Sequence, residues 1–311
     1  MRYSISKRLS AGGMLALILL ATTLAACTRP ARRSQVDPAA YTKEISEWQQ
    51  KRWADLKSES GWLTLVGLFW LKDGDNKFGR EADNDIVIAN ANVPPHAGVL
   101  SVKNGVVDFS ATQPGFTLDD KEIKTVELKS DDDAKPTVLH LSSLSFQIIK
   151  RGEKLGLRVK DSQNSDRLNF RGTEFYPADL KWRIDGQFER YNPPKPMPIT
   201  NALGMETAES SPGAIKFTVE GQEYRLDAVT EKDEPRFFMI IADKTSGKET
   251  YPAGRYLYVD PPDAAGHVII DFNKAYSPPC AFTKFATCPL PPRQNRLPFA
   301  IPAGEKYERH S

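Results

Sequence analysis

Residues 98–109 have the sequence GVLSVKNGVVDF, and this stretch decides the fold class. Lys103-Asn104-Gly105 is a turn signal between two short apolar runs, which predicts a β-hairpin. Similar runs, each bounded by turn residues, recur along the chain. Further predicted strands are Trp62–Leu71 (or two strands joined at Gly67), Asp85–Ile88, Val138–Leu141, Ser145–Lys150, Leu155–Val159, Ile215–Val219, Tyr224–Val229, Arg236–Ala242, Tyr256–Val259 and His267–Asp271. This spacing predicts a mainly β protein with sandwich or barrel sheets rather than βαβ units.

Three segments depart from the strand pattern. Tyr41–Glu59 predicts an N-terminal helix, because its large apolar residues fall on one face. Residues 191–198 contain four prolines, which interrupt strand ladders and predict a crossover between domains, although the polar stretch 161–166 is an alternative boundary. Residues 277–302 contain seven prolines and predict an irregular C-terminal segment. We therefore expect a helix plus β-sandwich domain over 41–190 and a second β-rich domain over 191–311.

The N-terminus has the pattern of an export signal. Arg2, Lys7 and Arg8 precede an apolar run that is too short to span a bilayer, and Leu24-Ala25-Ala26-Cys27 follows it. This pattern resembles the lipobox of bacterial lipoproteins, whereas an ordinary secretory signal or an anchor helix is the alternative. The resemblance implies that residues 1–26 are a signal peptide, that Cys27 is lipidated and that residues 27–40 form a tether.

Location and partners follow from that N-terminus. We expect a cell-envelope protein attached to the membrane through its N-terminal lipid. Thr28, in place of an aspartate, resembles the signal for outer-membrane sorting, so the periplasmic face of the outer membrane is the expected location. Without residues 1–26, three of the 42 basic residues are gone and 39 face 40 acidic ones. A surface with so balanced a charge gives no electrostatic reason to bind nucleic acid.

The C-terminal third resembles a known family of bacterial proteins. The residues that carry this resemblance, together with the Trp62 and Gly79-Arg80 regions, are Ile241–Thr245, Gly247–Tyr251, Ala253–Arg255, Asp271–Tyr276, Pro278–Phe282, Cys288–Pro292, Asn295–Leu297 and Ala303–Lys306. They are similar to the bacterial domain-of-unknown-function family 1684, over nearly the whole mature chain. The resemblance implies no particular activity, because that family has none established.

The first domain resembles a second family. Gly79-Arg80, Asn84-Asp85-Ile86 and His96-Ala97 occur in the order found at the start of forkhead-associated domains, β-sandwiches whose loops bind phosphothreonine. The resemblance implies a sandwich in which Arg80 contacts phosphate. However, proline stands where the family has a serine before the histidine, and Pro114-Gly115-Phe116 stands for its Asn-Gly-Thr motif. These two departures argue against phosphopeptide recognition.

Cys280 and Cys288 are the two cysteines that remain if Cys27 is lipidated. Seven residues separate them, and in an oxidising compartment they form a candidate disulfide. Two buried thiols are the alternative structural role, and a reactive thiol is the functional one. Of the four histidines, none has a metal-ligand spacing, so we predict no metal site, and no nucleotide or cofactor motif is present.

A set of polar residues near strand ends in the second domain is the candidate ligand-binding site. Its members are Lys248, Tyr251, Arg255, Asp271, Asn273 and Glu305. They predict either a network that holds the proline-rich tail or a site for an anionic ligand. Two functions remain open. The first is a binding module for an envelope protein or a small ligand, and the second is an enzyme that acts on a small anionic or envelope-derived substrate at Arg255, Asp271 and Asn273.

Overall fold

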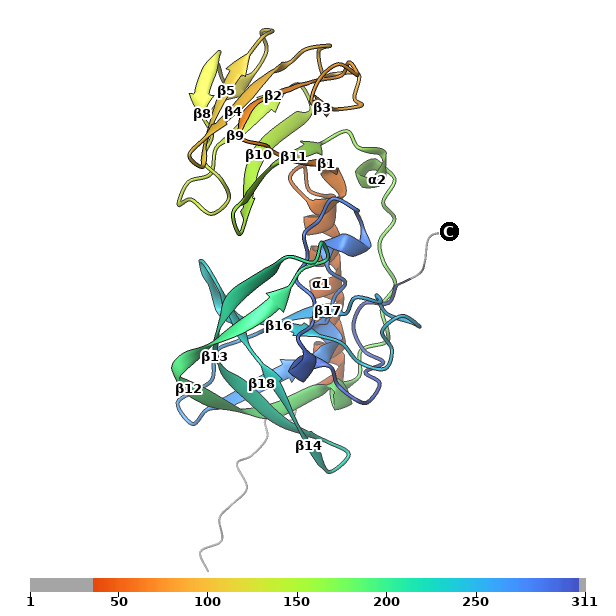
Figure 1. Ribbon diagram of the computed structural model, residues 1–311. Coiled ribbons are helices and arrows are strands. Elements are labelled where there is room, and N and C mark those ends of the chain that lie inside the picture. Colours follow the sequence, from red (N-terminus) through yellow and green to blue (C-terminus); the bar gives the residue numbers. More distant parts are fainter. Residues whose placement is uncertain (1–35, 308–311) are drawn as a thin grey trace, which may run out of the picture. The chain divides into compact units, whose positions relative to one another are not determined.

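The computed structural model describes residues 36–307 (Figure 1). The predicted signal peptide, the lipidation site Cys27 and most of the tether lie outside the described residues. Residues Asp37–Ser311 form one compact unit. Within the described part of the chain, no helix is both long and apolar enough to span a membrane.

The predicted N-terminal helix is confirmed as α1, Pro38–Lys57. It starts earlier than expected because Asp37 caps it: the Asp37 carboxylate accepts hydrogen bonds from the amides of Ala39 and Ala40, and Pro38 occupies a position that needs no amide donor. Shorter helical turns connect the strands. They are η1 (Trp62–Thr64), α2 (Ser165–Leu168), η2 (Leu180–Trp182), η3 (Phe272–Lys274), η4 (Pro279–Ala281) and η5 (Arg293–Asn295).

Two facing sheets form the first β-sandwich. The six-stranded sheet, in the order β1-β11-β10-β9-β6-β7, comprises β1 (Leu65–Trp70), β6 (Thr117–Leu118), β7 (Lys121–Glu122), β9 (Val138–Leu141), β10 (Leu144–Arg151) and β11 (Lys154–Asp161). The five-stranded sheet, in the order β3-β2-β4-β5-β8, comprises β2 (Gly74–Gly79), β3 (Ile86–Val87), β4 (Gly98–Lys103), β5 (Val106–Ala111) and β8 (Thr125–Glu127). Phe78 and Phe109 of the second sheet pack with Phe146 of the first in one core, which confirms the sandwich.

The C-terminal part contains two further antiparallel sheets. One, in the order β14-β13-β12-β18, comprises β12 (Arg183–Thr200), β13 (Glu206–Val219), β14 (Gln222–Asp227) and β18 (His267–Asp271). The other, in the order β15-β16-β17, comprises β15 (Val229–Glu231), β16 (Glu234–Ile241) and β17 (Arg255–Val259). Ile215, Leu257 and Ile270 share one core between these sheets. The mainly β fold predicted from the sequence is confirmed.

The proline-rich stretch 191–198 is not a break in the ladder but part of β12. Pairing with β13 shifts register between Arg190 and Lys195 and then continues to Thr200. Strand β18 pairs only with residues 183–187 of β12, so the other edge of the distal half carries no named strand. Pro194, Pro196 and Pro198 occupy alternating positions, so their backbone nitrogens face the same edge of the strand. Because no described strand pairs with that edge, the lack of N–H donors there costs no hydrogen bond of the sheet.

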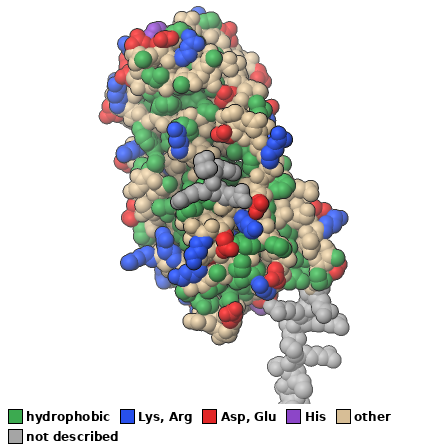
Figure 2. All heavy atoms as spheres, turned by 90° about the vertical axis from the view of Figure 1, so that its right-hand side faces the viewer, with side chains coloured by type: hydrophobic (Ala, Val, Ile, Leu, Met, Phe, Trp, Pro, Cys, Tyr) green, Lys and Arg blue, Asp and Glu red, His purple; other side chains and the backbone are tan. Residues whose placement is uncertain are grey.

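The predicted boundary after residue 190 falls inside this strand, whereas the division into the two domains stays a prediction. The C-terminal segment 277–302 is irregular, as expected, with only the short turns η4 and η5. On the face of the molecule drawn in Figure 2, basic and acidic side chains are both present, as the balanced composition predicts.

Candidate functional site

Arg255, a predicted site residue, is fully buried and bound on several sides. Its Nη2 lies 2.7 Å from Oδ2 of Asp243 and 3.0 Å from the carbonyl oxygen of Ile301, and its Nη1 donates to the carbonyl of Ala303. The other oxygen of Asp243 accepts hydrogen bonds from Thr245 and from the Ile301 amide. This buried ion pair and its hydrogen bonds tie the C-terminal segment to strand β17, while Nε of Arg255 has no hydrogen-bond partner among the described residues.

Asp271 and Asn273 belong to a different network. The Tyr41 hydroxyl of helix α1 donates to Oδ1 of Asp271 at 2.7 Å, and the Asn273 Nδ2 donates to the Tyr41 oxygen at 2.8 Å. Asn273 also accepts from the Asp179 amide. Burial and the neighbouring Asp271 raise the pKa of the Tyr41 hydroxyl, so it remains a donor. These contacts attach the start of α1 to β18.

The three other predicted residues, Glu305, Tyr251 and Lys248, are members of neither hydrogen-bond network. Glu305 is fully buried, and its carboxylate lies 3.4 Å from Nε of Arg52. Burial raises the pKa of Glu305, while the Arg52 charge opposes that rise. Tyr251 donates to the Cys280 carbonyl at 2.9 Å, and Lys248 is exposed.

Four of the six predicted residues, Arg255, Asp271, Asn273 and Glu305, are buried, but the structure does not bring all six together. Each buried member has partners within the protein, and none of the six lines the main pocket. Their role in ligand binding stays a prediction, and the geometry adds no support to it.

Cys280 and Cys288 lie side by side as free thiols. The Cys280 amide donates to Sγ of Cys288 at 3.0 Å. Hydrogen bonding from the Cys288 thiol lowers the pKa of Cys280, and the same bond together with burial raises the pKa of Cys288. The structure thus places the two residues in contact, while the disulfide stays a prediction.

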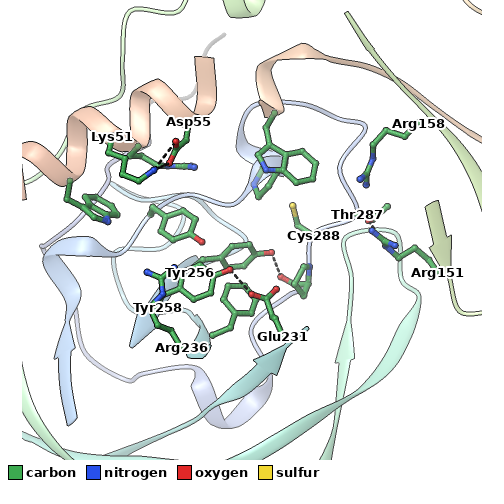
Figure 3. A pocket seen from close by; sticks show the side chains of 17 residues that line it. Lys51, Asp55, Arg151, Arg158, Glu231, Arg236, Tyr256, Tyr258, Thr287 and Cys288 are labelled. Carbon is green, nitrogen blue, oxygen red and sulfur yellow. Dashed lines mark hydrogen bonds and ion pairs between the residues drawn. The ribbon is translucent and has the colours of Figure 1, made fainter. Parts of the chain in front are cut away.

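The main pocket was not predicted from the sequence. It has a volume of about 650 Å³ and is lined by side chains from α1, the β10–β11 hairpin, the β15–β17 sheet and the C-terminal segment (Figure 3). This volume lies within the roughly 300–1,000 Å³ that is usual for small-ligand sites. Residues from distant parts of the chain form it, so no local motif marks it.

Aromatic rings form much of the pocket wall. The lining rings are Trp48, Trp62, Phe238, Tyr256, Tyr258 and Tyr276. Tyr258 and Tyr276 stack with ring centroids 6.4 Å apart, and Phe238 lies 5.2 Å from Tyr258. The hydroxyls of two of these tyrosines are occupied: Tyr258 donates to Glu231 at 2.6 Å, and Tyr256 donates to the Pro289 carbonyl at 2.9 Å. This part of the wall is therefore mostly apolar, and the hydroxyls of Tyr256 and Tyr258 already have acceptors.

Most charged side chains that line the pocket have a partner of opposite charge. Arg151 lies 2.8 Å from Asp131, Arg236 lies 2.7 Å from Glu234, and Arg52 and Lys51 pair with Glu305 and Asp55. Arg151 also donates to the Thr287 hydroxyl at 3.2 Å.

Arg158 of strand β11 is the exception among the described arginines that line this pocket. Only 7% of the residue is exposed, and neither Nε nor Nη2 has a hydrogen-bond partner. Its guanidinium lies over the Trp62 ring at 5.3 Å. Burial and the nearby positive charge of Arg151 lower the pKa of Arg158 to about 10, so the side chain remains a cation at neutral pH. Figure 3 shows Arg158 and Arg151 on the same side of the pocket, beside Thr287 and Cys288.

One sequence signal could have marked this residue. Arg158 interrupts LGLRV, the otherwise apolar run of the predicted strand Leu155–Val159. An arginine there has to find a partner, and only the tertiary structure shows that it has none. Among residues 36–307, no group of three or more His, Cys, Asp or Glu side chains is arranged to hold a metal ion. The absence of a metal and of a cofactor stays a prediction.

The fold and pocket define a mainly β protein with an N-terminal β-sandwich and a ligand-sized cavity. Residues 168–306 match the model of the family described as "Protein of unknown function (DUF1684)", which confirms the resemblance over these residues. The match does not include the Trp62 and Gly79-Arg80 regions, where we also expected it. No curated protein matches the sequence.

Several solved structures are similar to the chain. An uncharacterized protein of Haloarcula marismortui, solved by NMR, is 26% identical with a TM-score of 0.40, and the similarity covers 47% of this chain and 81% of that one. The FhaA FHA domain in complex with an intracellular protein domain is 15% identical with a TM-score of 0.21, covering 29% of this chain and 96% of that one. EmbR of Mycobacterium tuberculosis, in complex with a low-affinity phosphopeptide, is 15% identical with a TM-score of 0.21, and the similarity covers 40% of this chain and 32% of that one.

Proposed function

We propose that this protein is a lipid-anchored protein of the bacterial cell envelope that binds a small ligand in the pocket lined by α1, β11 and β16–β17. The observation that carries the binding proposal is the pocket itself, about 650 Å³ in volume, with an aromatic wall and one unpartnered buried arginine. Ligand sites in proteins are typically apolar cavities with a few polar groups that orient the ligand. The location rests on the N-terminal sequence alone.

The binding proposal can be tested with a neutral aromatic probe, 2-naphthamide. The full chain is expressed, extracted in detergent and dialysed to equilibrium against the same detergent with the probe. We expect saturable binding with one site per chain. Thr287 lines the pocket, so Thr287→Phe should reduce affinity at least about fivefold by filling the cavity. Thr125 is exposed on β8 and outside the pocket, so Thr125→Phe is the matched control and should bind like the wild type.

Equal binding by the wild type and both variants would place the probe elsewhere and contradict the proposal. The anchor is tested separately by labelling cells with an alkynyl fatty acid. The wild-type chain should carry the label and sediment with membranes, whereas Cys27→Ser should lose both properties. A labelled Cys27→Ser chain, or an unlabelled wild type, would refute the lipid anchor but would leave the pocket proposal intact.

A further inference from the structure

The unpartnered guanidinium of Arg158 points to what the pocket binds. Buried ions in proteins are normally paired or hydrogen-bonded, because the loss of hydration otherwise destabilises the folded state. Only 7% of Arg158 is exposed, yet among residues 36–307 no carboxylate lies within ion-pair distance of it, and Nε and Nη2 have no acceptor. Its Trp62 contact leaves those donors free. Because Arg158 lines the pocket, a ligand in the cavity is the partner that its charge can gain.

The unpartnered atoms of Arg158, Nε and Nη2, form one edge of the guanidinium plane and have almost no solvent-accessible surface, so a ligand contacts this edge after the side chain rotates toward the cavity. Two parallel N–H groups on such an edge match the two oxygens of a carboxylate, and this paired geometry is stronger and more specific than a single hydrogen bond. A neutral carbonyl could accept only part of this arrangement.

The charged residues that line the pocket make its two ends different. Glu231 also lines it, but its carboxylate accepts from Tyr258 and forms no ion pair with Arg158. Figure 3 shows Glu231 beside Tyr258, away from Arg158. A negatively charged group is repelled at the Glu231 end and attracted at the Arg158 end. The aromatic rings between the two ends suit an apolar body.

We infer that Arg158 binds the carboxylate of a small monocarboxylic ligand whose apolar or aromatic body packs against Trp62 and the tyrosine wall. This inference rests on the proposed function, since it assigns a ligand class to the same pocket. One unpaired guanidinium matches one negative charge, which favours a monoanion over a dianionic phosphate.

The test compares two probes that differ only in charge, 2-naphthoate and its amide 2-naphthamide, by equilibrium dialysis with the full chain. We expect the wild type to bind the carboxylate at least about tenfold more tightly than the amide. Arg158→Met should abolish this preference by weakening carboxylate binding about tenfold to a hundredfold, while amide binding changes less than about threefold. Arg158→Lys keeps the charge without the paired donors and should lose most of the preference.

Arg171 is exposed and outside the pocket, so Arg171→Met is the control and should retain the wild-type preference. If both probes bind the wild type equally, or if Arg158→Met keeps the preference, the inference is wrong although the pocket still binds ligands. If neither probe binds at millimolar concentration, both the pocket proposal and the inference are overturned. Unchanged amide binding by Arg158→Met also shows that the variant is folded.

Discussion

Arg158 and Arg255 are both buried arginines on β-strands, but their surroundings differ. Arg255 has a carboxylate, Asp243, and two backbone carbonyls as acceptors, whereas Arg158 lies against the Trp62 ring and its Nε and Nη2 have no acceptor in the described part of the chain. The first arrangement holds the C-terminal segment in place, and its charge is already neutralised within the protein. The second leaves a cation that lacks a partner at the wall of a cavity. The comparison teaches that burial alone does not identify a functional arginine. Whether the buried charge already has a partner within the protein distinguishes a structural arginine from one that can bind a ligand.

The largest expected effect is the loss of the Arg255 network. Arg255→Met leaves Asp243 as a buried carboxylate without its cation, which should lower the free energy of unfolding by about 3–5 kcal/mol. Chemical denaturation measures this change. Lys248 is exposed nearby, and Lys248→Met should change stability by less than about 0.5 kcal/mol. An Arg255→Met variant as stable as the wild type would show that this network is not structural.

Replacing Arg158 should act in the opposite direction. Arg158→Met removes a buried cation without a partner and should raise the free energy of unfolding by about 1–3 kcal/mol, although the contact with Trp62 is lost. Because folding lowers the pKa of Arg158 to about 10, the folded state is destabilised fully below that pH. The destabilisation then fades as the pH rises toward the pKa of a free arginine.

The stability difference between Arg158→Met and the wild type should therefore be constant from neutral pH to about 9 and narrow above 10. Thermal unfolding without ligand, at several pH values, measures it. A destabilised Arg158→Met variant would mean that Arg158 has a structural role like that of Arg255, and the contrast between the two would disappear.

A smaller effect is expected where helix α1 joins the second set of sheets. Tyr41→Phe removes the hydroxyl that donates to Asp271 and accepts from Asn273, which should reduce stability by about 1–2 kcal/mol. Tyr224→Phe is the matched control, since no described residue hydrogen-bonds to that hydroxyl, and it should behave like the wild type. Equal stability of both variants would remove Tyr41 from the structural network.

The smallest expected effect concerns the cysteine pair. Cys288 lines the pocket that contains Arg158, and the backbone carbonyl of Cys280 accepts a hydrogen bond from Tyr251. Since the Cys288 thiol lowers the pKa of Cys280, alkylation of Cys280 by iodoacetamide should reach half its maximum rate below the pH of about 8.5 that is usual for a free thiol. Cys288→Ala removes the thiol donor and should move this midpoint upward. Mass spectrometry of the labelled peptides assigns each site.

The same experiment tests the predicted disulfide. If the unreduced protein from the envelope takes up no label, and reduction restores it, the pair is bonded there. Labelling of Cys288 before Cys280 would contradict the pKa order given above.

The sequence by itself determined the class of fold and much of its detail. The helix, most strands and the irregular tail follow from residue spacing, turn chemistry and proline content, because these properties act between neighbours in the chain. A polar network that includes Arg255, Asp271 and Glu305 and holds the tail was one of two alternatives, since the backbone of a tail without strand pairing needs other hydrogen-bond partners. The strand through residues 191–198 was missed, because proline is excluded from paired positions but not from an open edge.

Only the tertiary structure decided which polar residues meet and which remain alone. The pocket brings together α1, β11, β16, β17 and the C-terminal segment, which lie far apart in the sequence. Whether a buried charge has a partner depends on distances of a few ångströms between such segments. A single sequence contains no direct record of those distances, and so the fold rather than the sequence pattern identified Arg158.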